Sequence, residues 1–218
     1  MAIDFRKNSH IVKDIILHVI IYALALATIA PFIWMLLTSV KDIGDIFVYP
    51  PKWLPSKFHF ENYARAFQAA PFGRYYLNSL IVACTVTLGQ LITCSMAAYA
   101  FARLQFKGRD VLFYIFLGTM MIPYQVTMIP SFMVLYWLGW VDSYQAMIVP
   151  GLASAFGTFL LRQFFLTIPK ELEEAVYIDG CGKFRVLWQI IIPLSKPALA
   201  TLAIFTFMGT FNDFIWAL

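Results

Sequence analysis

Charged residues are scarce in this sequence. Aspartate, glutamate, lysine and arginine make up 13% of its 218 residues, whereas apolar residues reach 61% and mean hydropathy is +0.74. A soluble globular domain has about 25% charged and about 45–50% apolar residues, so that class is excluded. The net charge of +4 suits a membrane surface, and because basic residues are not interleaved with aromatic ones, nothing indicates nucleic acid as a partner.

Catalytic and metal-binding motifs are also missing. The sequence contains no G-x-x-x-x-G-K-[ST], no H-E-x-x-H, no G-x-S-x-G and no S-x-x-K. The three cysteines, Cys84, Cys94 and Cys181, lack C-x-x-C spacing, so neither a metal site nor a disulfide framework is predicted. We therefore expect a chain that is not an enzyme and that holds no metal or cofactor of its own.

Long apolar runs are abundant, and each is long enough to cross about 30 Å of hydrocarbon. Five spans are predicted, at residues 15–40, 75–101, 111–138, 144–165 and from 195 to the last residue, 218. The strands of a membrane β-barrel have about 10 residues, so the predicted fold class is all-α, a polytopic transmembrane helical bundle. Pro123 and Pro130 predict that the third span is bent or broken, and residues 61–67 predict a short amphipathic surface helix.

Lysine and arginine in the short loops indicate the orientation. With the N-terminus inside, the inner segments and Arg162 carry eleven basic residues, and the outer segments carry five. The expected organisation is a cytoplasmic N-terminal segment at 1–14 and a transmembrane domain at 15–218, in which residues 166–194 form a cytoplasmic loop.

A short helix is predicted inside this loop. Glu171, Glu173 and Glu174 fall in its first turn, where negative charge complements the helix dipole, and Gly180 permits a left-handed ending. At about 100° per residue, the helix has a mostly apolar side and a polar side. The apolar side comprises Leu172, Ala175, Val176, Ile178 and Asp179, and the polar side comprises Lys170, Glu173 and Tyr177. We expect the apolar side to dock on a partner.

Asp213 is the single acid predicted inside a span, where ionised side chains are costly and therefore candidates for function. Two interpretations stay open. Asp213 lies on a substrate path inside the bundle, paired with Asn212, or it lies near the outer interface, with Trp216 at headgroup depth. So little intramembrane charge argues against an ion-coupled secondary transporter.

The loop carries a recognisable motif. Residues Glu174-Ala-Val-Tyr-Ile-Asp-Gly180, followed after nine residues by Ile190-Ile-Ile-Pro193, resemble the cytoplasmic EAA signature of the membrane subunits of bacterial ABC importers. The sequence departs from the signature where Val176 replaces the second alanine and Ile192 replaces leucine. Tyr63 with residues 78–80, and the stretches 98–104, 121–126 and 169–175, resemble the second, shorter permease subunit of the maltose/oligosaccharide type.

The resemblance implies the ABC type I importer permease fold, a bacterial inner-membrane location, and a sixth span beyond the five in this chain. It implies a second permease subunit in a heterodimer, two ATP-binding subunits that hold ATP and magnesium, an extracytoplasmic solute-binding protein and a sugar substrate. It also implies which residues couple to the ATPase. The expected coupling residues are Glu171, Glu174, Ala175, Asp179, Gly180 and Pro193.

The expected function is that of a carbohydrate permease. It would carry sugar from the binding protein to the cytoplasm, driven through the loop helix by the separate ATPase. The candidates for the substrate path are Asn212, Asp213, Tyr124 and Gln125. The alternatives are an ABC permease for another solute, such as a glycerol phosphate or a polyamine, and an ion-coupled secondary transporter.

Overall fold

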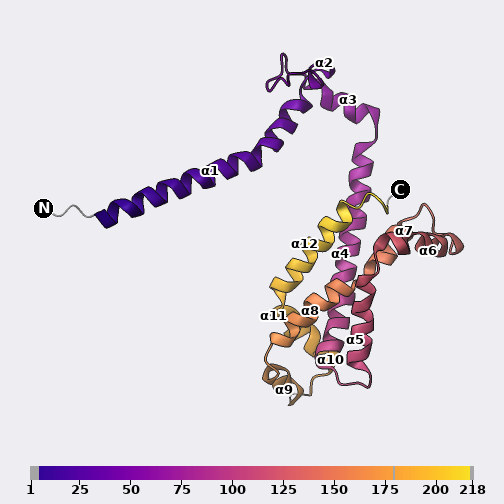
Figure 1. The fold of residues 1–218 in the computed structure, drawn as a ribbon. Coiled ribbons are helices and arrows are strands. Elements are labelled where there is room, and N and C mark those ends of the chain that lie inside the picture. Colours follow the sequence, from indigo (N-terminus) through magenta and orange to yellow (C-terminus); the bar gives the residue numbers. More distant parts are fainter. Residues whose placement is uncertain (1–4, 179, 217–218) are drawn as a thin grey trace. The chain divides into compact units, whose positions relative to one another are not determined.

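The computed structural model describes residues 5–178 and 180–216, and within these ranges all regular secondary structure is helical. The chain divides into two compact units, residues 1–73 and 74–218 (Figure 1). Among the described residues, three helices, or up to five spans with each bent pair taken as one, are long and apolar enough to cross a membrane, in agreement with the predicted all-α polytopic class.

The first unit contains α1 (Phe5–Ser39), α2 (Ile43–Ile46) and α3 (Glu61–Ala69). The membrane-crossing part of α1 is Lys13–Ser39, close to the predicted first span, and α3 coincides with the predicted amphipathic segment. The loop before α3 is fastened through Lys41, which is 1% exposed and lies 4.2 Å from the ring centroid of Trp34. The Asn62 amide donates to the carbonyls of Ser39, at 3.1 Å, and Lys41, at 2.9 Å.

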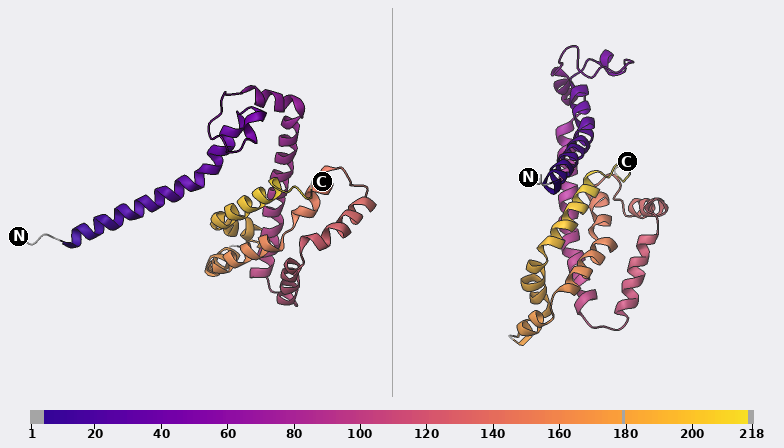
Figure 2. Two further views of the ribbon diagram at one scale, coloured as in Figure 1. Left: turned by 45° about the horizontal axis from the view of Figure 1, so that its top comes forward. Right: turned by 60° about the vertical axis from the view of Figure 1, so that its left-hand side comes forward.

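The second unit is built around α4 (Phe72–Arg103), the long helix beside which α8 (Ala155–Thr167) and α12 (Lys196–Phe211) lie (Figures 1 and 2). Its core lies where small residues of α4 let the other helices approach. One contiguous cluster of this core consists of the buried residues Cys94, Ala98, Tyr99, Ala102, Leu161, Phe165, Ile168, Val186, Leu187, Ile191, Ala198 and Leu202.

The predicted break in the third span is confirmed. Helix α5 (Arg109–Gly118) continues into the 3-10 turn η1 (Thr119–Met121), and α6 (Tyr124–Trp137) then departs at 100°. The break falls at Ile122, whose ψ of 116° is extended because the following Pro123 disfavours helical backbone before it. Pro130 stays inside α6.

The fourth span has a break that the sequence analysis did not predict. It consists of α7 (Tyr144–Ile148), the 3-10 turn η2 (Val149–Leu152) and α8. Side chains of α4 satisfy the carbonyls that the break frees. Gln90 donates to the Gly151 carbonyl at 2.7 Å, and Thr93 donates to the Leu152 carbonyl. Such partners permit irregular backbone at membrane depth.

The last part of the chain turns twice. After α9 (Glu171–Ile178), the short helices α10 (Lys183–Val186), π-helical η3 (Leu187–Ile191) and α11 (Ile192–Leu194) form one segment, and α12 leaves it at 82°. The fifth span was predicted to continue to residue 218, and this was wrong, because α12 ends at Phe211. The Asp213 carboxylate accepts from the Trp216 N–H at 3.1 Å, a local bond that competes with helix continuation.

Candidate functional site

The predicted glycine stop of the loop helix is confirmed. Gly180 has φ +77°, its N–H donates to the Tyr177 carbonyl at 3.0 Å, and the Cys181 N–H donates to the Val176 carbonyl at 3.2 Å. These two bonds form the Schellman ending of a helix. A side chain at residue 180 would meet nothing within 4 Å, so only the left-handed backbone demands glycine here.

The two sides predicted for α9 do not coincide with its buried and exposed sides. On the polar side, Glu173 is 6% exposed, whereas Tyr177 is 38% exposed and bonds through its hydroxyl to that of Tyr99, 3.0 Å away. The physical reason lies on α4, whose last turn presents Arg103 and Tyr99 toward α9. A buried acid requires such a partner, and the loop sequence alone does not reveal it. Val176, assigned to the docking side, is partly buried against the core.

Arg103 and Glu173 form a buried ion pair. The guanidinium Nε and the carboxylate Oε1 lie 2.8 Å apart, without the alignment of a hydrogen bond, and the two side chains are 4% and 7% exposed. The Arg103 Nη2 donates to the carbonyls of Phe165, at 2.6 Å, and Ile168. Burial raises the pKa of the Glu173 carboxyl, and the adjacent Arg103 charge opposes that rise.

Several exposed residues lie in the first turn of α9, and Tyr177 near its end is also 38% exposed. Glu171, Leu172 and Glu174 are exposed there, with Leu172 at 45%. This set, called here the α9 edge, retains two of the predicted coupling residues. Asp179 lies outside the described residues, as does the side chain of Ala175.

Pro193 lies apart from the α9 edge in the chain. It is exposed, belongs to α11 and precedes the 82° bend at Ser195 by two residues. The Ser195 N–H donates to the carbonyls of Ile191, at 3.0 Å, and Ile192, at 3.1 Å. The buried Ser195 hydroxyl has no bonding partner within the described part of the chain, so Ser195 starts α12 without acting as a side-chain cap.

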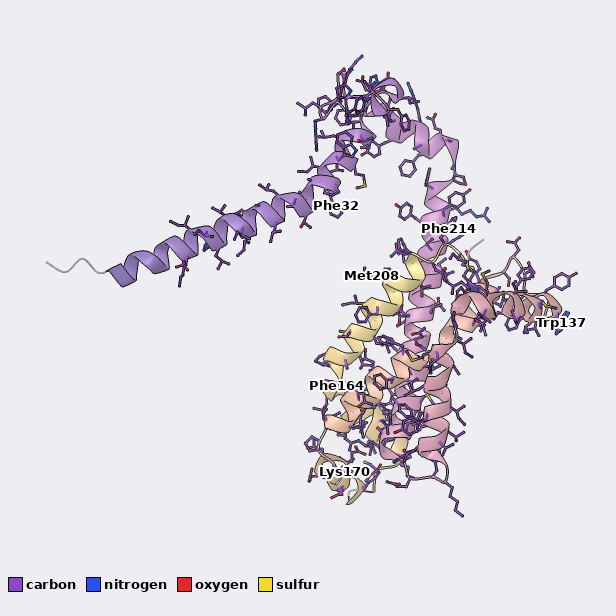
Figure 3. The ribbon with its side chains drawn as sticks, viewed as in Figure 1. Phe32, Trp137, Phe164, Lys170, Met208 and Phe214 are labelled. Carbon is purple, nitrogen blue, oxygen red and sulfur yellow. The ribbon has the colours of Figure 1, made fainter. Side chains whose placement is uncertain are left out.

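A cavity of about 1090 Å³, called here the Asp213 cavity, lies at the other end of the second unit. Figure 3 shows Lys170, directly before α9, at one end and Phe214, next to Asp213, at the opposite end. The polar residues that line the cavity include Arg74, Tyr75, Asn78, Ser79, Asp142, Ser143, Tyr144, Thr210 and Asp213. The Tyr144 hydroxyl donates to the Asn78 side chain at 2.7 Å.

The four candidates for the substrate path have different surroundings. Asp213 lines the cavity just beyond α12, not inside the helix as predicted. Asn212 does not pair with it but donates to the Met208 carbonyl at 2.8 Å. Tyr124 packs edge-on against Trp216, with 6.0 Å between ring centroids, and Gln125 is exposed. The structure therefore places Asp213 in the cavity and Tyr124 against Trp216, one of its lining residues.

Sequence reasoning missed several residues. Arg103 was identified only as part of a basic loop, and the hydrogen bond between Asn78 and Tyr144 was not predicted. In both cases the bonding partners lie more than 60 residues apart along the chain. The one sequence feature that could have indicated Arg103 is its position at the end of an apolar helix rich in small residues. Among residues 5–178 and 180–216, no cluster of histidine, cysteine, aspartate or glutamate is arranged to hold a metal ion.

Comparisons with known proteins agree on the family. Residues 90–218 match the family described as binding-protein-dependent transport system inner membrane component. The diacetylchitobiose uptake system permease protein NgcG of Streptomyces coelicolor is 34% identical, with 91% of this chain and 66% of the relative covered. The sn-glycerol-3-phosphate transport system permease protein UgpE of Yersinia enterocolitica is also 34% identical, with 93% of this chain and 74% of the relative covered.

A solved structure supports the fold. A chain of a bacterial ABC transporter that imports the acidic polysaccharide alginate matches with a TM-score of 0.84 and 27% identity, over 100% of this chain and 76% of that one. The predicted ABC importer permease fold and multi-pass inner-membrane class are confirmed. This chain thus belongs to the family of binding-protein-dependent transport system inner membrane components.

Proposed function

We propose that this chain is one permease subunit of an ATP-driven ABC importer for a carbohydrate, with a glycerol phosphate as the alternative solute. The observation that carries the proposal is the α9 edge. Glu171, Leu172 and Glu174 are exposed on a short helix that Gly180 terminates and that Glu173 fastens to α4. An exposed surface on a helix that is firmly attached to a membrane span is suited to contact with a subunit that moves the span.

The proposed partner at this edge is a separate ATP-binding subunit, because the chain has no phosphate-binding loop. Glu174 would meet a basic residue there, and Leu172 would enter an apolar contact. The full assembly would contain a second permease subunit, two ATP-binding subunits and an extracytoplasmic solute-binding protein. The excess of basic residues on one side supports a cytoplasmic N-terminus and a cytoplasmic α9.

The Asp213 cavity is the proposed part of the substrate path. It lies at the end of the unit opposite α9, and its lining combines charged groups, hydroxyls and an amide with the ring of Trp216. Convergent hydrogen-bonding groups and an aromatic ring are the chemistry that a hydroxyl-rich solute requires. Similarity to relatives named for diacetylchitobiose and glycerol phosphate supports this class of substrate.

The test is uptake into proteoliposomes that contain this chain with the permease, ATPase and binding proteins encoded beside it. Labelled diacetylchitobiose, sn-glycerol-3-phosphate and alginate oligosaccharides serve as substrates, with and without ATP. We expect ATP-dependent uptake of a saccharide. Uptake of glycerol phosphate alone would select the alternative, and uptake that persists without any ATPase, driven by an ion gradient, would replace the proposal with a secondary transporter.

Two variants test the role of α9. Glu174→Ala and Gly180→Pro should leave the chain in the membrane but abolish the coupling of ATP hydrolysis to uptake. Gly182→Ala is the matched control, because Gly182 has an ordinary φ of −76° and open space around it. Unimpaired uptake by the Gly180→Pro variant would refute docking through this helix.

A further inference from the structure

Arg103 connects three elements at one guanidinium. It is the last residue of α4, it pairs with Glu173 of α9, and it donates to two carbonyls at the end of α8, those of Phe165 and Ile168. Carbonyls at a helix C-terminus lack ordinary partners within the helix. The Phe165 carbonyl also accepts from the Ile168 N–H at 3.2 Å, and Arg103 adds a side-chain bond to it and to the Ile168 carbonyl. The side chain is 4% exposed, and its position is therefore defined by these contacts.

A second contact between α9 and α4 is a hydrogen bond between two tyrosine side chains. The hydroxyls of Tyr99 and Tyr177 lie 3.0 Å apart, and each tyrosine stands four residues from one member of the ion pair. Four residues are about one helical turn, so the two contacts join the same face of α4 to the same face of α9. Two attachments one turn apart resist rotation of α9 as well as its separation.

Stability alone does not account for this arrangement. A buried ion pair gains little over an apolar contact of the same volume, because both charges lose their hydration. The neighbouring basic residues of the same loop show the ordinary situation. Lys107 is exposed, and Arg109 pairs with the adjacent Asp110. Arg103 instead combines hydrogen bonds to the end of α8 with an ion pair to α9, and so connects helices that lie far apart in sequence.

We propose that Arg103 is the positioning residue that makes α9 move together with α4 and the end of α8 as one body. This inference rests on the proposed coupling function. When the ATPase displaces the α9 edge, α4 and α8 are then displaced with it, and the loop that contains α9 does not deform instead. Tyr99 and Tyr177 keep the orientation of α9 during that movement.

The native cysteines offer a direct test. Cys84, which is exposed on α4, and Cys181, which directly follows the end of α9, serve as the two labelling sites. The buried Cys94 is replaced by alanine in the protein used for labelling. From Cys84 to Arg103, α4 rises by about 28 Å, which suits distance measurement between two spin labels. The distance is measured in the assembled complex before and after addition of magnesium and a non-hydrolysable ATP analogue. The same complexes are assayed for co-purified ATPase and for substrate transported per ATP hydrolysed.

In the parent protein we expect the same distance in both states, because α9 and α4 move together. In Arg103→Gln we expect nucleotide to shift or broaden the distance and transport per ATP to fall at least tenfold, with the ATPase still bound. Arg103→Lys keeps the positive charge but cannot contact Glu173 and the two α8 carbonyls at once. Its distance change and its transport per ATP should therefore lie between those of the parent and those of Arg103→Gln. Lys107→Gln removes a positive charge from the same loop and should behave as the parent.

Three outcomes overturn the proposal: a nucleotide-dependent distance change in the parent, an unchanged distance in Arg103→Gln, or parental transport per ATP in that variant. Should Arg103→Gln not accumulate in the membrane, Glu173→Gln and Arg103→Lys are judged by the same criteria. Loss of the ATPase from the parent complex would refute the proposed function itself, whereas normal coupling in both parent and Arg103→Gln would refute only this inference.

Discussion

Replacing Gly157 by alanine tests the packing of the second unit. A Cβ atom at Gly157 would lie 2.9 Å from Leu202 Cδ1 and 3.0 Å from Cys94 Sγ. Ordinary contacts between carbon atoms have a separation of about 3.5–4.0 Å, so these neighbours must retreat by roughly 0.5–1 Å. Leu202 and Cys94 are each 1% exposed and therefore have no open space to enter.

The expected cost follows from comparison with a second glycine. In α12, a Cβ atom at Gly209 would meet nothing within 4 Å, so Gly209→Ala should gain about 0.5–1 kcal/mol from helix propensity alone. Gly157→Ala receives the same gain but also the overpacking cost of about 1–3 kcal/mol. The difference between the two variants therefore isolates that cost, and at about 2–4 °C per kcal/mol we expect the melting temperatures to differ by several degrees.

The assay is thermal unfolding of the detergent-solubilised protein, followed by tryptophan fluorescence. A Gly157→Ala variant at least as stable as Gly209→Ala would refute the close contact of α4, α8 and α12. Adding Leu202→Val to Gly157→Ala should restore part of the loss, since it removes the clashing methyl position. A double variant whose stability change equals the sum of the single changes would contradict direct contact between the two positions.

Three further predictions concern the same unit, each measured by thermal unfolding. Gly180→Ala should cost about 1–2 kcal/mol, because φ is +77°, whereas Gly182→Ala should be close to neutral, and equal effects would refute the left-handed ending. Because burial raises the pKa of Glu173, its contribution to stability is complete below the ordinary glutamate pKa, near 4.5, and is lost as pH rises through the raised folded-state value. The melting temperature of the parent minus that of Glu173→Gln should therefore decrease from pH 4 to pH 7, and a constant or increasing difference would contradict a raised pKa. Gln90→Leu should cost about 1–3 kcal/mol, because it leaves a carbonyl of the η2 break unpaired, whereas the exposed Gln125→Leu should cost little, and the reverse order would contradict the role of Gln90.

Local chemistry explains which features the sequence predicted. Apolar runs of sufficient length located the spans, Pro123 located the break of the third one, and Gly180 located the end of α9. In each case the deciding constraint is a property of one residue type or of neighbouring residues, such as the missing N–H of proline or the tolerance of glycine for positive φ. Such constraints are visible without knowledge of what packs nearby.

Features that depend on distant partners were not predictable in this way. The side of α9 that faces the core depends on Arg103, and the break in the fourth span depends on Gln90 and Thr93, all about 60 or more residues away along the chain. The end of α12 depends on a local bond of Asp213, but apolar flanking residues obscured it. The candidate coupling site was therefore found from its motif, whereas the residues that hold it were found only in the structure.

The bonds of Gln90 have a consequence for how the bundle can deform. Its amide donates to the Gly151 carbonyl of η2, and its carbonyl oxygen accepts from Thr206 of α12 at 2.9 Å. Apolar helix surfaces in lipid exchange one contact for a similar one when they slip by a residue, about 1.5 Å along the axis. A side chain bonded on both sides does not tolerate that slip. Gln90 therefore sets the axial register of α4, η2 and α12 relative to one another, and it opposes sliding of these segments along their axes.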